Sequence, residues 1–585
     1  MRGSVPLRME CAPAFNYARD AHRTSIVPDA SIPHGTTPTD TPNSSNHRHY
    51  KGLFESDSLS LDLRFIAETT IHGHGTHEDV PEVPRIELKE LDLGKQGHLG
   101  KALCADFELG EGQCVTFVVR HDPPRGDSEK SRKPSEKFAS EIGVSFDTLI
   151  AGVSKLRAID DPFLTKDLLA GLLKSTNKYW MTWIKQSTYN GSWKEAVLRS
   201  ALALKLLIYE PTGAVVASPT FSLPEYIGGT RNWDYRYSWI RDASFTLYAL
   251  LRLGFTYEAD AYMEFIFQRL RDKNPDGSIQ IMYTIHGGKD LEEIELEHLD
   301  GHRGSKPVRI GNGAADHLQL DIYGELLDCI YLGQKFGKPL SYDDWVLVRE
   351  LVDFVVSNVN RPDLSIWEVR NKERHFTYSK VMLWVAIDRG LRLADKRSLP
   401  CPNRIKWLTA RDELYENVMK NAWNAEKSVF GQSYEDSDVL DSAVLIMPLV
   451  FFMQPSDPRF VNTLKEILKT PERGGLTSNG LVYRYDVKKA DDGVGGEEGT
   501  FSLCTLWCVE ALTRVGQYDE AMLEKSVTMF EDFLMYLNHV GLCTEEISDA
   551  GEALGNAVQG FTHVTLISAA YNLSRTLTKK HVPSI

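Results

Sequence analysis

The segment YDEAMLEKSVTMFEDFLMYLNH, residues 518–539, carries the spacing of apolar residues that decides the fold class. Its apolar positions follow one another at steps of 4, 3, 4 and 3 residues, at Leu523, Val527, Phe530, Leu534 and Leu537. Because an α-helix has about 3.6 residues per turn, this spacing places the five side chains on one face of a helix. The segment is therefore predicted to be a helix with one buried face.

The same spacing recurs between Asp160 and the C-terminus in roughly a dozen segments, with almost no strand pattern between them. A second example is the segment that contains Leu351, Phe354, Val355 and Val359. Long connections rich in glycine and aromatic residues separate these segments, whereas a small helix bundle has short loops. We therefore expect residues 160–583 to form a closed ring of antiparallel helix pairs, an (α/α)6 barrel, with a site in the long connections.

The first part of the chain shows a different pattern, in which apolar and polar residues alternate as they do in β-strands. The clearest examples are SLSLDLRFIAE (58–68), ALCADFEL (102–109) and QCVTFVVRH (113–121). Residues 1–155 are therefore predicted to form a β-sandwich domain. Residues 25–50 are rich in Pro, Ser, Thr and Asn, which predicts a flexible low-complexity insertion in that domain.

Composition and charge narrow the class of protein. The 585 residues exceed what one hydrophobic core supports, and 42% hydrophobic residues are typical of a folded protein. A net charge of -15 argues against nucleic acid or a membrane surface as partner, because phosphate groups attract clustered Lys and Arg. The eight scattered cysteines predict no disulfide framework, and the N-terminus lacks the apolar run of a signal peptide. These features favour a soluble, cytoplasmic protein with a neutral substrate.

One segment combines aromatic and charged residues ahead of an apolar helix: GGTRNWDYRYSWIRDASF, residues 228–245. Aromatic rings cover the apolar face of a sugar ring, and charged groups bind its hydroxyls. Tyr235, Trp239, Arg241 and Asp242 are therefore candidate sugar-binding residues. In the alternative interpretation, Asp242 only caps the following helix and Arg241 pairs with a surface carboxylate.

A second segment, SIWEVRNKERHF (365–376), places Glu368 directly after Trp367. An indole ring beside a carboxyl group excludes water and raises its pKa, as a general acid requires. A glutamate on a solvated face is the commoner explanation of such a dipeptide taken alone.

The third segment, GLCTEEISDAGEALGNAVQGFTH (541–563), contains the adjacent carboxylates Glu545 and Glu546. Neighbouring carboxylates repel each other, so we do not expect both to be buried without partners. A solvated acidic loop is the alternative. The acidic loop Asp491-Asp492-Gly493 lacks the spaced ligands of a calcium loop and is expected to be solvated as well.

Together these segments resemble glycoside hydrolase family 15, the glucoamylase, glucodextranase and trehalase group, from about Ser175 to Leu577. The resemblance rests on blocks in the order of the family: 218–245, PVRIGNGAADHLQLDIYGE (307–325), SIWEVR (365–370), EEGTFSLCTLWCVEAL (497–512) and 544–570. It implies that Glu368 is the general acid and Glu545 the general base. It further implies that the terminal glucose is bound by Tyr235, Trp239, Arg241 and Asp242, with Trp367, Arg484 and Glu546 as further substrate-binding candidates.

The resemblance implies an inverting, exo-acting α-glucoside hydrolase that releases β-glucose from non-reducing ends and needs no metal or cofactor. A glucoamylase-type activity on maltooligosaccharides or starch fragments is the first expectation, and α,α-trehalase is the alternative. A catalytically silent regulatory or sugar-sensing barrel is the second alternative. Members of this branch begin with a complete β-sandwich, so the start of this chain suggests a partial, N-truncated one.

Overall fold

The computed structural model describes residues 3–29, 49–69, 82–121, 166–336 and 338–581. The chain divides into two compact units, Met1–Met181 and Thr182–Ile585, which are described separately below. The domain boundary expected between residues 155 and 160 lies in 122–165, outside the described residues.

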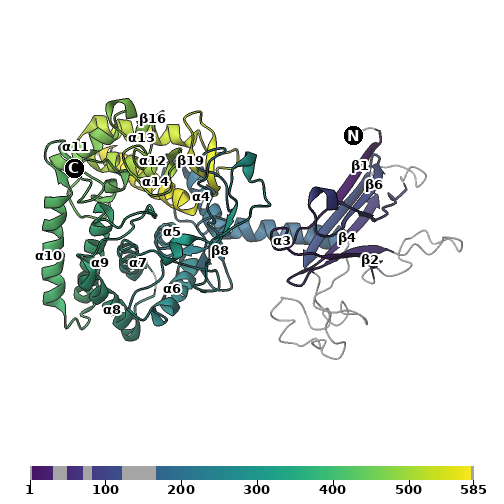
Figure 1. The fold of residues 1–585 in the computed structure, drawn as a ribbon, viewed down its shortest axis with the longest axis horizontal. Helices are drawn as coiled ribbons and strands as arrows, with labels where there is room; N and C mark the ends of the chain where they lie inside the picture. Colours follow the sequence, from purple (N-terminus) through teal and green to yellow (C-terminus); the bar gives the residue numbers. More distant parts are fainter. Residues whose placement is uncertain (1–2, 30–48, 70–81, 122–165, 337, 582–585) are drawn as a thin grey trace. The chain divides into compact units, whose positions relative to one another are not determined.

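The first unit is strand-rich, as predicted. Its two antiparallel sheets have the orders β1-β6-β5 and β2-β3-β4-β7 (Figure 1). The three predicted strands are confirmed as β4, β6 and β7. The bounds of the seven strands are β1 Val5–Cys11, β2 Arg23–Pro28, β3 Tyr50–Glu55, β4 Ser60–Thr69, β5 Lys89–Leu91, β6 Ala102–Leu109 and β7 Gln113–His121.

Side chains from both sheets form one core that includes Phe54, Leu63 and Leu103. The sheets approach each other closely at Gly52 of β3, where an added Cβ would lie 2.1 Å from Leu103 Cδ1 of β6. This contact shows that the two sheets pack face to face, as in a sandwich.

The expected insertion at 25–50 is a connection between two paired strands. Pro28 at the end of β2 pairs with Tyr50 at the start of β3, so the ends of the predicted insertion belong to strands. Residues 30–48 lie outside the described residues.

Twelve α-helices lie in the described residues after Lys166, which confirms the helical prediction. Their bounds are α3 Lys166–Ile184, α4 Lys194–Leu206, α5 Ile240–Leu253, α6 Thr256–Arg271, α7 Ile322–Phe336, α8 Tyr342–Asn358, α9 Thr377–Arg397, α10 Arg404–Asn421, α11 Pro458–Ile467, α12 Ser502–Val515, α13 Glu520–Leu534 and α14 Gly560–His581.

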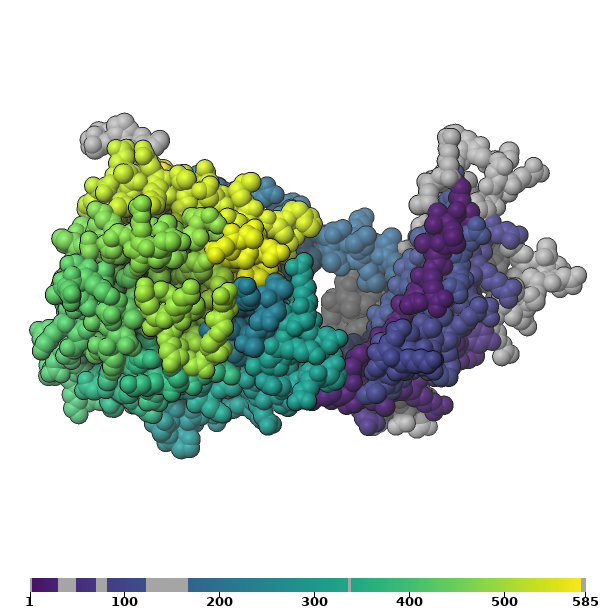
Figure 2. All heavy atoms as spheres, turned by 45° about the horizontal axis from the view of Figure 1, so that its top comes forward, coloured from purple at the N-terminus to yellow at the C-terminus, as the bar shows by residue number. Residues whose placement is uncertain are grey.

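The helices of the second unit include an inner ring, and further helices pack on its outside. In the inner ring α5 contacts α7, α7 contacts α9, and the short 3-10 helix η5 (Ser442–Ile446) connects α9 to α12. Helix α14 packs on α12, α5 and α4 and closes the ring, so the yellow and blue parts of this unit lie side by side (Figure 2). Helices α4, α6, α8, α10, α11 and α13 pack outside this ring.

The inner and outer helices differ in how much of their surface is buried. The outer helix α10 buries one stripe, which contains Trp407, Leu414 and Val418, whereas α9 of the inner ring is buried around most of its circumference. Helix α13 buries Leu523 and Phe530 of the predicted stripe, together with Ser526, Met529 and Phe533. The expectation of one buried face is therefore correct for outer helices and wrong for α9, which has neighbours on all sides.

Candidate active site

A cleft lies at the N-terminal ends of the inner helices. Trp239, Arg241 and Asp242 come from the start of α5, Glu368 precedes α9, and Glu545 precedes α14. Its empty volume is about 750 Å³, including the part open to solvent. Every predicted site residue except Glu546 lines this cleft.

Arg241 and Asp242 are buried side chains of the cleft wall. Arg241 Nη1 donates to Gln319 Oε1 at 3.0 Å and lies 3.4 Å from Asp321 Oδ2. Asp242 Oδ2 is buried and has no hydrogen-bond partner among the described residues. Burial raises the pKa of Asp242 to about 6, although the neighbouring Arg241 opposes this.

The alternative roles of these two residues do not match their positions. Helix α5 begins after Trp239, which occupies the N-cap position, so Asp242 lies inside the first turn. Arg241 pairs with buried groups and not with a surface carboxylate. Both side chains therefore offer polar groups to a ligand in the cleft.

Glu368 lies beside the start of α5, next to Trp239 and Arg241. Its Oε1 accepts a hydrogen bond from Trp239 Nε1 at 2.8 Å and lies 3.4 Å from Arg241 Nη2. Its side chain is 21% exposed, and its φ of 56° is left-handed. The indole that hydrogen-bonds Glu368 is thus Trp239, whereas the predicted neighbour Trp367 donates its Nε1 to Asp441.

Glu545 is almost fully buried, with 2% exposure. Its Oε1 accepts hydrogen bonds from Tyr235 Oη at 2.7 Å and Gln559 Nε2 at 3.1 Å. Its Oε2 has no partner among the described residues. Burial, with a smaller contribution from the carboxylate of Glu225, raises the pKa of Glu545 to about 8.

Tyr235 and Trp239 connect the two glutamates. Their rings meet edge to face with centroids 5.5 Å apart, and each ring hydrogen-bonds one of the two carboxyl groups. Two residues of one short segment thereby hold Glu368 and Glu545 in the same cleft.

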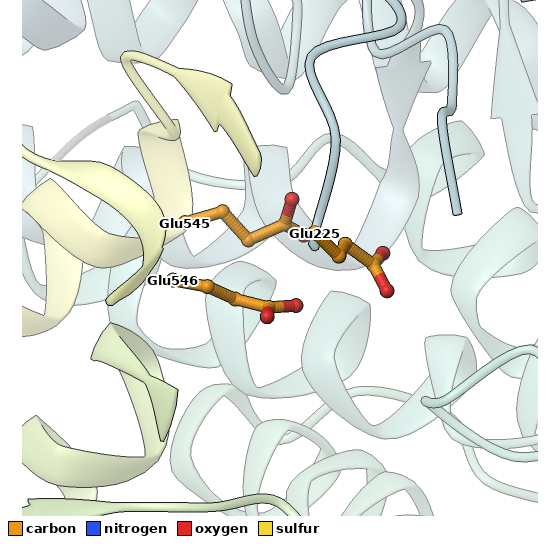
Figure 3. Close-up of side chains that lie close together, drawn as sticks. All are labelled: Glu225, Glu545 and Glu546. Carbon is orange, nitrogen blue, oxygen red and sulfur yellow. The ribbon is translucent and has the colours of Figure 1, made fainter. Parts of the chain in front are cut away.

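Glu225 and Glu546 lie beside Glu545 (Figure 3). One carboxylate oxygen of each lies within 4.8 Å of the others, close enough to hold a metal ion. Glu225 also lies 3.6 Å from Arg231 and 3.9 Å from Arg484. The positive charges of these two guanidinium groups disfavour the binding of a metal cation at the cluster. Burial raises the pKa of Glu546, and it also raises that of Glu225, although Arg484 and Arg231 oppose this.

Both adjacent glutamates are buried and each accepts a hydrogen bond, so the alternative of a solvated acidic loop does not hold for them. A register shift between Thr544 and Glu546 on β19 (Thr544–Ile547) interrupts its pairing with β20 (Ala553–Ala557). Such a bulge changes the alternation of side chains along a strand. Glu546 Oε2 accepts from the backbone nitrogen of Gly499 at 2.6 Å, so Glu546 supports the loop before α12 and does not line the cleft.

Arg484 lines the cleft, but its guanidinium group is engaged by Glu498 through Nε at 2.9 Å and through Nη2. The expectation of a solvated acidic loop is wrong for Asp492. This residue is buried, and it accepts hydrogen bonds from Arg231 Nη2 at 2.5 Å and Tyr485 Oη at 2.7 Å. Both residues therefore belong to a buried ion-pair network, part of which lines the cleft.

Sequence reasoning missed several groups in contact with the predicted residues. Their residue types alone do not distinguish them, but all five lie in the quoted family blocks: Glu225, Gln319, Asp321, Arg370 and Gln559. Arg370 follows Glu368 by two positions and also lines the cleft.

The sequence matches the family model described as "Glycosyl hydrolases family 15" over residues 191–571. The chain belongs to this family. Trehalase from Mycobacterium tuberculosis is 36% identical over 466 residues, covering 77% of this chain and 67% of that protein. Trehalase from Mycolicibacterium smegmatis is 39% identical over 414 residues, covering 70% of this chain and 60% of that protein. The chain therefore spans about 60–67% of the length of these relatives.

A bacterial glucoamylase solved in complex with acarbose shares the fold of this family 15 member. The superposition has a TM-score of 0.58 at 14% identity and covers 91% of this chain and 75% of that chain. This family 15 member therefore has a mainly helical, glucoamylase-like fold after a strand-rich region. None of the helices that the structure describes is long and apolar enough to cross a membrane.

Proposed function

We propose that the chain hydrolyses α,α-trehalose with inversion of configuration. The observation that carries this proposal is the placement of Glu368 and Glu545 in one cleft, each hydrogen-bonded to one ring of the Tyr235–Trp239 pair. Two carboxyl groups on either side of a glycosidic bond, with room for water, perform hydrolysis by inversion.

In the proposed mechanism, Arg241 and Asp242 hold the hydroxyls of the glucose that is attacked. Glu368 protonates the glycosidic oxygen, and the leaving glucose departs with that proton. Glu545 Oε2, which lacks a hydrogen-bond partner in the described structure, accepts a proton from the attacking water. Since the water attacks the face opposite the leaving group, the α-linked glucose is released as the β-anomer.

Trehalose is the preferred substrate in this proposal because the relatives with 36% and 39% identity are trehalases. A glucoamylase-type activity, which the sequence analysis put first, becomes the second candidate. The sequence relatives favour the alternative over the first expectation, since the glucoamylase likeness at 14% identity concerns the fold alone. A silent barrel is disfavoured because both carboxyl groups line the cleft.

The test measures glucose release from trehalose, maltose, isomaltose and soluble starch, and follows the early products from trehalose by NMR. Inversion releases one β-glucose from the attacked ring and one α-glucose from the leaving ring, whereas retention releases α-glucose alone. Equal early amounts of the two anomers are the expected result. Early release of α-glucose alone would contradict inversion, and activity on maltose without activity on trehalose would reverse the order of the two candidates.

A further inference from the structure

Four side chains that line the cleft differ in their exposed fraction, which is smallest for Arg241 and largest for Arg370. The exposed fraction of the side chain is 7% for Arg241 and 12% for Asp242, 21% for Glu368 and 28% for Arg370. All four side chains line the same cleft. Arg370 therefore lies toward solvent from Glu368, and the Arg241–Asp242 pair lies toward the interior.

Arg370 is held in place by groups from other segments of the chain. Its Nη1 and Nη2 donate to the two carboxylate oxygens of Glu293 at 3.0 and 2.7 Å. Its guanidinium lies over the ring of Trp233, 4.4 Å from the centroid. Its backbone nitrogen donates to the carbonyl oxygen of Asp492 at 2.7 Å. A guanidinium held by a bidentate carboxylate and an aromatic ring loses little conformational entropy on binding a ligand.

Glu293 is shared between Arg370 and Arg309, and Arg309 also lies 3.2 Å from Glu295. Arg309 lies 3.6 Å from Glu293 and 5.0 Å from the centroid of Trp233, so one carboxylate serves two guanidinium groups. Glu293 uses one hydrogen from each terminal nitrogen of Arg370. Among the described residues, the Nε–H group and the second hydrogens of both terminal nitrogens thus remain as donors for sugar hydroxyls.

The proposed mechanism indicates which part of the substrate lies near Arg370. If Arg241 and Asp242 hold the attacked glucose, the glycosidic oxygen lies at Glu368. The leaving group then lies beyond Glu368, on the more exposed side. Arg370 lies on that side, two residues after Glu368 in the sequence.

We propose that Arg370, oriented by Glu293 and Trp233, binds the hydroxyls of the leaving sugar of a disaccharide substrate. This inference rests on the proposed function, because it takes the attacked glucose to be held by Arg241 and Asp242. It assigns recognition of the second hexose to this cluster, separate from the groups that bind the first.

The test compares two substrates that share the attacked glucose. The leaving group of trehalose is a second glucose. The leaving group of α-glucosyl fluoride is fluoride, so this substrate has no second ring. For Arg370→Met we expect kcat/KM for trehalose to fall by about 10–100-fold, since hydrogen bonds from a charged donor are lost. We expect kcat/KM for α-glucosyl fluoride to remain near the wild-type value. Arg370→Lys keeps the charge but loses the bidentate contact with Glu293, so it should give an intermediate loss on trehalose alone.

Arg374→Met is the matched control, because Arg374 lies in the same segment, pairs with Asp436 at 2.9 Å and does not line the cleft. It should leave the ratio of the two kcat/KM values unchanged. Equal losses on both substrates in Arg370→Met would overturn the inference, and so would an unchanged kcat/KM for trehalose. If the wild-type enzyme cleaves maltose and not trehalose, the proposed substrate is wrong. In that case, the ratio of kcat/KM for maltose to kcat/KM for α-glucosyl fluoride tests whether Arg370 binds the leaving sugar.

Discussion

The side chain of Glu368 is 21% exposed and is hydrogen-bonded to a neutral indole, which leaves its second oxygen for a substrate. Glu368→Gln removes the proton that the leaving glucose needs, so kcat on trehalose should fall by ~10²–10⁴-fold. Fluoride needs little protonation to depart, and hydrolysis of α-glucosyl fluoride should suffer much less. Steady-state kinetics on both substrates provide the measurement. A similar loss on both would assign Glu368 a role other than that of the acid.

The carboxyl group of Glu225 contributes to the raised pKa of Glu545, and both residues are buried. The general base acts only when ionised, so kcat/KM should rise with pH toward the raised pKa of Glu545, about 8. Glu225→Gln removes a neighbouring negative charge, which lowers the pKa of Glu545 and moves the acid limb of the profile to lower pH. Glu552→Gln provides the control, because Glu552 lies in the same hairpin with an exposed side chain. An unchanged acid limb in Glu225→Gln would argue against this coupling.

At the scale of elements, the hairpin β19–β20 positions the base through a close backbone contact. Gly555 of β20 has a φ of 71°, and an added Cβ would lie 2.6 Å from Glu545 Oε2 and 2.8 Å from Glu545 Cβ. Gly555→Ala should therefore displace Glu545, and misplacement of a reacting group by about 1 Å lowers turnover by about 10²-fold.

The matched control for this prediction is Gly551→Ala. Gly551 connects the same two strands with a φ of 82°, and an added Cβ would lie 3.5 Å from its nearest neighbour, Tyr536 Cε1. Both variants should lose about 1 kcal/mol of stability from the left-handed backbone, and only Gly555→Ala should lose activity. Melting temperature and kcat measured together test this. Equal kcat in the two variants would show that the contact with Glu545 is unimportant.

At the scale of the whole molecule, every residue that lines the cleft belongs to the second unit, between Ala217 and Phe561. Trp183 near the end of α3 stacks on Phe255 with centroids 4.1 Å apart and donates to Glu258. A shortened chain of residues 166–585 keeps these contacts, so we expect it to unfold cooperatively and to retain the kcat of the full chain. Calorimetry and trehalose hydrolysis check this. A folded but inactive fragment would show that the first unit contributes to the reaction.

Features that depend on the local spacing of residues could be predicted from the sequence. The steps of 4 and 3 residues in 518–539 predicted α13, and the alternating segments predicted β4, β6 and β7. These predictions succeed because the periodicity of side chains in a helix or strand is a property of neighbouring residues. The aromatic and charged segment 228–245 likewise placed four cleft residues in one stretch.

The surroundings of each site residue depend on the tertiary structure and could not be predicted from the sequence. Glu368 and Glu545 are 177 residues apart (545 − 368), and only the packing of the inner helices brings them into one cleft. The indole at Glu368, the position of Glu546 away from the cleft lining and the burial of Asp492 all differ from expectation. The physical reason is that desolvation and hydrogen bonding depend on the atoms that packing brings together, and those atoms come from distant parts of the chain.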